Sequence, residues 1–209
     1  MKNTYLLLIL LTSVSVFDSC NLKNGEKEID PFYTSRSFGD IPTTPLLKPL
    51  KLSYEEIPRK WHLEIPYSFN HQMNIDSLTE IGVEKTFIYG KIFQKLDIDS
   101  NYKNSDYVFV SKFNIISKSV TYSKALSDEI RIFPIDTIHK VFIIPERWFV
   151  INVADSSIEA FFSKKDYNNY LNERKLSSKL YNIDSIHKQF IETGILPWFP
   201  DSIKTRLAK

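Results

Sequence analysis

The sequence predicts an α+β fold, a mostly antiparallel β-sheet of short strands followed by two to three C-terminal helices packed on one face. Between residues 59 and 162, short runs of apolar and β-branched residues alternate with polar ones, the period of a strand with one buried face. The runs are joined by short connections, which favours antiparallel pairing because parallel strands need long crossovers. After residue 162 the period lengthens to that of a helix.

Length and composition indicate one domain with an N-terminal extension. The chain has 209 residues, and we divide it into a signal segment over residues 1–19, a proline-rich tether over residues 20–51 and a single α+β domain over residues 52–209. With 43% hydrophobic and 14% aromatic residues, the domain can build a substantial core. The formal net charge of +2 gives no electrostatic reason to expect a nucleic-acid partner.

The N-terminus has the pattern of a secretory signal. Lys2 precedes an apolar run over residues 5–17, which is shorter than the roughly 20 residues of a membrane-spanning helix. The run ends in Val16-Phe17-Asp18-Ser19-Cys20, with a small residue directly before the only cysteine. This segment resembles the lipobox of bacterial lipoproteins, although Phe17 and Asp18 depart from the usual residues. The alternative is that Cys20 is an ordinary thiol or a small buried residue.

The lipobox resemblance implies that Cys20 is the first residue of the mature protein and carries fatty acids such as palmitate. Several acyl chains would hold the protein on a bilayer without a spanning helix, since each buried methylene contributes about 0.8 kcal/mol. Asn21 stands where enterobacterial lipoproteins of the inner membrane have aspartate. The resemblance therefore implies a cell-envelope protein, lipid-anchored at the outer membrane.

Residues 20–51 are expected to form the tether. Residues 21–30 are polar and charged, and Pro31, Pro42, Pro45 and Pro49 follow. Prolines at this density favour extended chain over helix or sheet. We expect the first half to be mobile and the second half to lie against the domain.

The predicted strands follow in order. Residues 59–65 alternate cleanly, with Trp61, Leu63 and Ile65 on one face. Residues 75–83 are ambiguous between a strand and a helical turn, because their apolar residues are three apart. Residues 86–93 form a strand in which Gly90 indicates a bulge or a close backbone approach. A polar loop over 97–106, a strand over 107–116 and an irregular stretch over 117–128 precede strands over 129–133, 139–144, 147–153 and 158–162.

The C-terminal helices have clear boundary signals. Ser163 stands three residues before Asp166, which predicts a helix N-terminus of the capping-box kind. Tyr167, Tyr170 and Leu171 then fall on one helical face. A second helix is expected over residues 178–193, with Gly194 as its left-handed cap, and a short third helix over residues 201–208.

The sequence contains no complete motif for catalysis, for a cofactor or for a metal. None of the four histidines has a second histidine or cysteine at ligand spacing. Residues 97–101 imitate the start of a calcium loop, but Tyr102 and Val108 occupy the positions of its glycine and glutamate. Glycoside hydrolysis needs two acidic side chains, and Glu55, Glu56 and Glu64 lie near Trp61 in the sequence. The sequence assigns them no role.

Aromatic residues are the most unusual feature of the composition. They gather at residues 148–170 and again at Trp198 and Phe199. Core packing explains Phe149 and Tyr170 best. Trp198 and Phe199, which are flanked by prolines, are candidate interface residues, because tryptophan is enriched where proteins meet. Core and interface remain open for Trp198.

Residues 146–171, ERWFVINVADSSIEAFFSKKDYNNYL, resemble small uncharacterised lipoproteins and immunity-like proteins of Bacteroidota. Residues 88–92 and 45–49 look similar too. The resemblance implies a protein that acts by binding and implies no catalytic residues. We therefore expect a membrane-anchored, non-catalytic module that binds a protein partner and acts as an immunity or accessory factor. The alternatives are a structural or assembly lipoprotein of an envelope complex and, less favoured, an envelope hydrolase.

Overall fold

The structure is a computed structural model of the chain. It describes residues 28–56, 59–66, 69, 73–97, 107–110, 115–116, 131–134 and 141–208. The chain divides into two units, Met1–Asp30 and Pro31–Lys209. All the helices and strands described below belong to the second unit.

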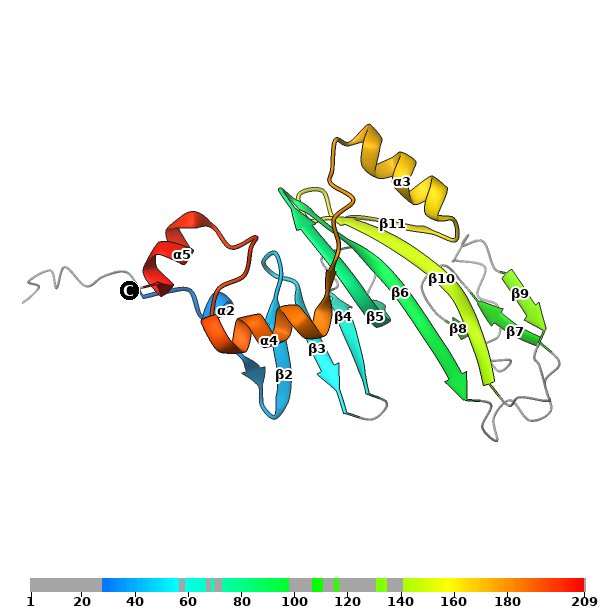
Figure 1. Cartoon of the computed structure of the whole chain (residues 1–209), viewed down its shortest axis with the longest axis horizontal. Helices are drawn as coiled ribbons and strands as arrows, with labels where there is room; N and C mark the ends of the chain where they lie inside the picture. The colour runs from blue at the N-terminus through cyan, green and yellow to red at the C-terminus, as the bar shows by residue number, and fades with distance from the viewer. Residues whose placement is uncertain are drawn as a thin grey trace, which may run out of the picture. The chain divides into compact units, whose positions relative to one another are not determined.

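The main sheet confirms the predicted α+β class (Figure 1). Its strands follow the order β1-β2-β3-β4-β5-β6-β10-β11, and every neighbouring pair is antiparallel. The strands are β1 (Ser37–Phe38), β2 (Ile41–Pro45), β3 (Lys51–Glu55), β4 (Lys60–Ile65), β5 (Met73–Glu84), β6 (Phe87–Asp97), β10 (Val141–Asn152) and β11 (Ser157–Phe161). A short strand, β12 (Tyr181–Asn182), pairs with the end of β5.

The chain between β6 and β10 contains a separate three-stranded sheet in the order β8-β7-β9. It comprises β7 (Tyr107–Val110), β8 (Ile115–Ile116) and β9 (Arg131–Pro134). The prediction of one strand over residues 107–116 is wrong, because β7 and β8 are two strands that pair with each other in antiparallel orientation. Asp97, at the start of the predicted polar loop over residues 97–106, is the last residue of β6. The rest of that loop and the ambiguous stretch over residues 117–128 lie outside the described residues.

Two predicted strands, over residues 139–144 and 147–153, are one long strand in the structure. β10 pairs with β6 from Val141 to Asn152, and the register shifts between Ile144 and Arg147. The sequence suggested that one strand ends and another begins here, because Pro145 and Glu146 interrupt the regular pattern on either side. A bulge of this kind bends a strand without ending it.

β5 resolves the ambiguity over residues 75–83 in favour of a strand. Its register shifts against β4 opposite Ser77, which has a φ of 59°, and again against β6 between Leu78 and Glu80. Each extra residue moves the next side chain to the other face. Ile75, Leu78 and Ile81 therefore all reach the core although they are three residues apart.

Gly90 confirms the predicted close backbone approach. A Cβ atom at this position would lie 2.6 Å from the carbonyl oxygen of Glu80 and 2.9 Å from the ring of Phe149. Only glycine fits at this point without displacing the neighbouring strand or the core aromatic ring.

Much of the predicted tether is part of the fold. Residues 31–51 contain α2 (Pro31–Thr34), β1 and β2, and Leu46 and Leu50 are buried. The expectation that the second half docks is confirmed, but the prediction that the prolines favour extended chain over helix and sheet is wrong for residues 31–45. Proline is compatible with a first helical turn and with strands near a sheet edge, where a missing N–H donor costs little.

The C-terminal helices are α3 (Lys164–Glu173), α4 (Ile183–Thr193) and α5 (Asp201–Leu207). Ser163 caps α3 as predicted, and Gly194 is the left-handed cap of α4 with a φ of 70°. α4 begins later than residue 178, because the Asn182 side chain accepts a hydrogen bond from the Ser185 N–H and fixes the first turn there.

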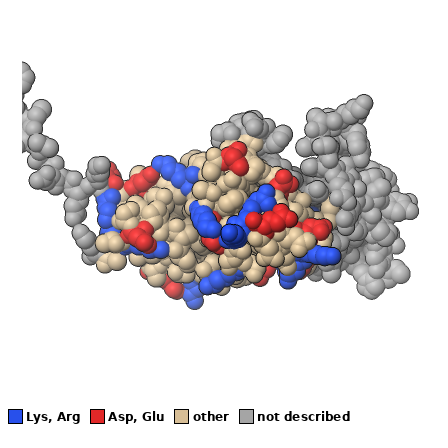
Figure 2. Space-filling model, turned by 90° about the horizontal axis from the view of Figure 1, so that it is seen from above, with Lys and Arg blue, Asp and Glu red and all other residues tan. Residues whose placement is uncertain are grey.

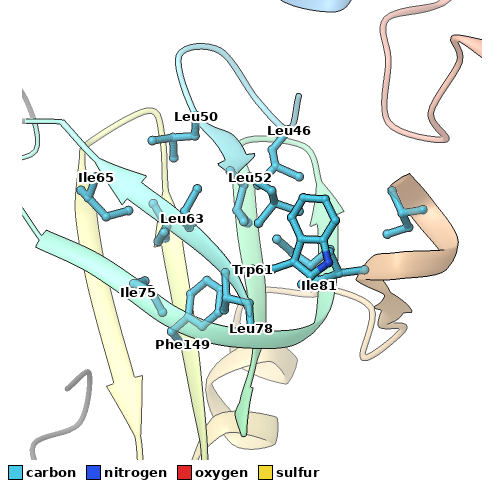
Figure 3. Packing of buried hydrophobic residues seen from close by; sticks show 14 of the residues in the cluster. Leu46, Leu50, Leu52, Trp61, Leu63, Ile65, Ile75, Leu78, Ile81 and Phe149 are labelled. Atoms are coloured by element: carbon cyan, nitrogen blue, oxygen red, sulfur yellow. The ribbon is translucent and has the colours of Figure 1, made fainter. Parts of the chain in front are cut away.

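The main core lies between the sheet and α4 (Figure 3). Its centre is made of aliphatic residues from β3 to β6 together with Trp61 and Phe149, and α4 adds Ile183, Ile186 and Phe190. A second cluster, which we call the outer cluster, joins α3 to the sheet and contains Tyr89, Trp148, Val150, Tyr167, Leu171 and Leu176. Phe149 and Ile151 belong to the main core while Trp148 and Val150 belong to the outer cluster, so β10 is covered on both faces.

Candidate functional site

A polar pocket lies beside the outer cluster, between α3 and the sheet. Its volume is about 470 Å³. The lining residues come from β5, β6, β10, α3 and the segment after α3, and they are Glu80, Lys91, Glu146, Trp148, Lys164, Tyr167, Asn168, Ser178 and Leu180. Small-molecule sites usually have volumes of about 300–1,000 Å³, so the pocket is large enough to hold a ligand.

Strand and helix periodicity bring these side chains together. Glu146 and Trp148 are two residues apart on β10, and Lys91 of β6 is the direct register partner of Trp148. Tyr167 and Asn168 lie one turn into α3 from Lys164, at the spacing of neighbours on a helical surface. The sheet thus forms the floor of the pocket, and the N-terminal half of α3 forms a wall.

The charges on the floor form a compact group around Lys91. Its Nζ atom lies 2.5 Å from Oε1 of Glu146 and 3.8 Å from Oε2 of Glu80. Lys164 adds a second positive charge at the wall, so the lining has two residues of each sign. Figure 2 shows basic and acidic side chains interspersed over one face of the molecule, and the described residues there form no extended patch of one sign.

Tyr167 is the most distinctive group of the pocket. It is 2% exposed, its ring stacks on Trp148 with 6.3 Å between centroids, and its hydroxyl has no hydrogen-bond partner among the described residues. Burial, assisted by the nearby Tyr89 and Glu80, raises the pKa of Tyr167 well above its usual value. Burial likewise raises the pKa of Tyr89 to about 12. Both phenols are therefore neutral at physiological pH.

The structure describes only some of the residues predicted to have functional roles. Cys20, the predicted lipid-attachment site, lies outside the described residues. Phe199 is 2% exposed and packs against Phe190 and Tyr33, so its side chain is part of the core and is not available to a partner. Trp198 is half-buried, and its Nε1–H donates a 3.2 Å hydrogen bond to the carbonyl oxygen of Pro45.

The acidic residues singled out near Trp61 do not converge with it. Trp61 points into the core, whereas Glu64 occupies an alternate, exposed position of β4. Glu55 instead lies 3.5 Å from the ammonium of Lys60. Within the part of the chain that the structure describes, no group of three or more histidine, cysteine or acidic side chains could hold a metal ion.

The sequence did not reveal the pocket, although one signal was present. Glu146 and Trp148 share one face of a strand, as do Tyr89 and Lys91, so each strand has aromatic and charged residues alternating with the apolar core positions. A strand with one face in the core normally has solvated polar residues on the other face. Aromatic residues on that second face indicate that something packs there, and in this fold it is α3.

No known protein family, curated protein or solved structure matches the chain. Among the described helices, none is long and apolar enough to cross a membrane.

Proposed function

We propose that the protein is a lipid-anchored component of the cell envelope whose Pro31–Lys209 unit is a non-catalytic binding module for a protein partner close to the membrane. The anchor is acylated Cys20, and the lipobox-like residues 16–20 support it. The outer membrane is the proposed location.

One observation favours this function over that of a long-reach assembly factor. Residues 31–51 are built into the fold, so only residues 21–30 separate the anchor from the compact unit. Ten extended residues span about 35 Å at most, compared with roughly 110 Å for the whole predicted tether. A unit held this close to the bilayer can engage only partners at the same surface, which suits a binding module better than a scaffold.

The position of Lys91 supports binding over glycoside hydrolysis. A glycosidase needs two carboxylates with the scissile bond between them. In this pocket the ammonium of Lys91 forms ion pairs with both Glu80 and Glu146. A substrate would have to displace a lysine that is paired with both acids, so the proposed role is non-catalytic.

The anchor is tested by metabolic labelling of the full-length protein with an alkyne analogue of palmitate. Wild-type protein should be labelled and found in the outer-membrane fraction, whereas Cys20→Ser should be unlabelled and released from membranes. Asn21→Ala is the matched control and should behave as wild type. Equal labelling of the wild type and Cys20→Ser would refute the anchor.

The partner is tested by purifying the full-length protein from detergent-solubilised membranes of its own source after mild crosslinking. A stoichiometric protein should co-purify with the wild type and be lost with Cys20→Ser, because the unanchored unit no longer shares its surface. Recovery of the lipidated protein alone would count against a protein-binding function.

A further inference from the structure

We propose that the hairpin formed by β1 and β2 rests on the surface of the bilayer, with the side chains of Phe38 and Ile41 buried at the boundary between head groups and acyl chains. This inference rests on the proposed lipid anchor, because the anchor keeps the hairpin beside a membrane. It goes further by assigning a second membrane contact to the folded unit itself. The exposure of the pair, its place in the chain and its small area carry the proposal.

The hairpin presents an apolar pair to solvent. Phe38 is 81% exposed and Ile41 is 44% exposed, which makes them the two most exposed large apolar side chains among the described residues. They are register partners on either side of the two-residue loop over residues 39–40, so their side chains lie on the same face. A single exposed apolar side chain is ordinary, but a pair that projects from a hairpin tip forms an apolar surface without a cover.

The hairpin holds this pair in place before any contact is made. Backbone pairing continues beyond the pair, because the N–H of Thr43 donates a 2.9 Å hydrogen bond to the carbonyl oxygen of Arg36. β2 in turn pairs with β3 in the main sheet. Side chains on such a framework lose little conformational freedom on contact, so even a small apolar surface can contribute to binding.

The length of chain between the proposed anchor and the hairpin selects the bilayer as the occupant. Only residues 21–30 separate Cys20 from the folded unit, and β1 is the first strand of that unit. Ten extended residues span about 35 Å at most. The bilayer is therefore an apolar phase that stays within reach of the hairpin, at a high effective concentration.

The small area of the surface argues against a protein in the same place. A stable protein interface buries about 800 Å² on each partner, contributed by about 20–30 residues. Two apolar side chains supply only a small part of that area. Contact with a bilayer has no such requirement, because the anchor holds the protein on the membrane and the hairpin only adds to it.

The charges of the hairpin limit the depth of the contact. Residues 36–41 are all exposed, and Arg36 and Asp40 are the charged residues among them. Their charges cancel, so the contact does not require anionic lipids and should be insensitive to salt. The carboxylate of Asp40 has to remain among the head groups, because a charge in the hydrocarbon core is costly. The proposed contact is therefore shallow.

The test uses the full-length lipidated protein in phosphatidylcholine vesicles that contain lipids brominated near the head groups, since bromine quenches tryptophan fluorescence at short range. The three natural tryptophans give the wild-type background. Phe38→Trp should gain a component that is quenched at low and at high salt. Adding Ile41→Ser should lower the equilibrium constant of the contact about fivefold by removing half of the apolar pair. Adding Ser37→Ala instead should leave it unchanged.

Glu173→Trp is the control for an exposed position away from the hairpin. The side chain of Glu173 is 75% exposed at the end of α3, and α3 packs on β10 and β11 at the opposite edge of the main sheet (Figure 1). Its tryptophan should be quenched no more than the wild-type background. Equal quenching of Phe38→Trp and Glu173→Trp would refute a contact specific to the hairpin.

Flotation of the same vesicles separates this proposal from the anchor. Protein that floats with the vesicles but shows no added quenching in Phe38→Trp would overturn the hairpin contact and leave the anchor in place. Protein that does not float would overturn both. Unchanged quenching on adding Ile41→Ser would show that the apolar pair does not make the contact. A shift of emission that grows with the protein-to-lipid ratio, without quenching, would assign the hairpin to a second copy of the chain.

Discussion

The hydroxyl of Tyr167 gives the sharpest prediction at the scale of single residues. Tyr167→Phe removes a buried group that lacks a partner among the described residues and keeps the ring that stacks on Trp148. We expect the free energy of unfolding of the ligand-free protein to rise by about 1 kcal/mol, because the unfolded state alone loses a solvated hydroxyl. Urea denaturation measures this change.

Tyr170→Phe is the control for that measurement. Tyr170 is half-buried on the same helix, and its ring lies 3.4 Å from the guanidinium of Arg174. Its hydroxyl is outside the pocket lining, so the free energy of unfolding should change by less than about 0.5 kcal/mol. A large loss of stability in Tyr167→Phe would mean that the hydroxyl already has a partner in the ligand-free protein.

His187 makes the stability of the fold depend on pH. Burial lowers its pKa below the usual 6.5, although Asp184 acts in the opposite direction. Above pH 6.5 the imidazole is neutral in both states, and its full contribution to stability is present. As the pH falls from 6.5 toward the folded-state pKa, the unfolded chain takes up a proton that the folded chain does not, and stability is lost.

We therefore expect the free energy of unfolding to fall more steeply between about pH 7.5 and pH 5 in the wild type than in His187→Gln. Other titrating groups act in both proteins and cancel in the comparison. Denaturant titrations across this range give the two slopes. Parallel slopes would show that His187 titrates alike in the folded and unfolded states.

At the scale of elements, one hydrogen bond joins β4 to α4. The Nε1–H of Trp61 donates to Oδ1 of Asp184 at 2.7 Å, although the two residues are 123 positions apart in the chain. Trp61→Phe should lower the free energy of unfolding by about 2 kcal/mol, because it removes a hydrogen bond to a carboxylate and reduces packing in the core.

Asp184→Asn separates the hydrogen bond from the charge. The variant keeps an acceptor oxygen for Trp61 and loses only the favourable charge in the first turn of α4, so it should cost less than about 1 kcal/mol. Thermal denaturation of the two variants side by side would check the order. A larger loss for Asp184→Asn would indicate that the carboxylate charge, and not its acceptor oxygen, is the main contribution.

The elements differ in how well the sequence predicts them. β4, α3 and the cap at Gly194 follow from local signals, because alternation and capping depend on neighbouring residues. β5 could not be assigned, because its bulges are recognisable only beside its partner strands. For the same reason, residues 139–153 suggested two strands where β10 is continuous.

At the scale of the whole molecule, residues 31–52 should be required for folding. Phe32, Leu46, Leu50 and Leu52 are all buried. At about 2 kcal/mol for each buried side chain, a chain that begins at Ser53 would lose about 8 kcal/mol. That loss is comparable to the total stability of a typical domain, about 5–15 kcal/mol.

We expect the chain that begins at Ser53 to lack a cooperative unfolding transition and the chain that begins at Pro31 to retain one, as followed by circular dichroism. Cooperative unfolding of the shorter chain would show that residues 31–51 are not needed for folding and act only as a tether.

The candidate site could not be predicted from the sequence, because it too depends on which strands become neighbours. Glu80, Lys91, Glu146 and Tyr167 come from four elements, and none stands at a motif spacing from another. They converge because Lys91 and Trp148 are register partners and because α3 returns across β10 and β11. Strand register is a long-range property, so residue patterns predict the outer face of each strand but not which residues meet there.

The pairing of β6 with β10 has a consequence for how this protein can evolve. Asp97 and Val141 are register partners at the end of the ladder, so the chain leaves the main sheet and returns to it at adjacent positions. Residues 98–140 thus begin and end at one place, and their length does not affect the geometry of the strands around them. Insertions, deletions or exchange of this segment can accumulate while the pocket on the other part of β10 keeps its form. In related proteins, sequence variation should therefore concentrate between these two strands.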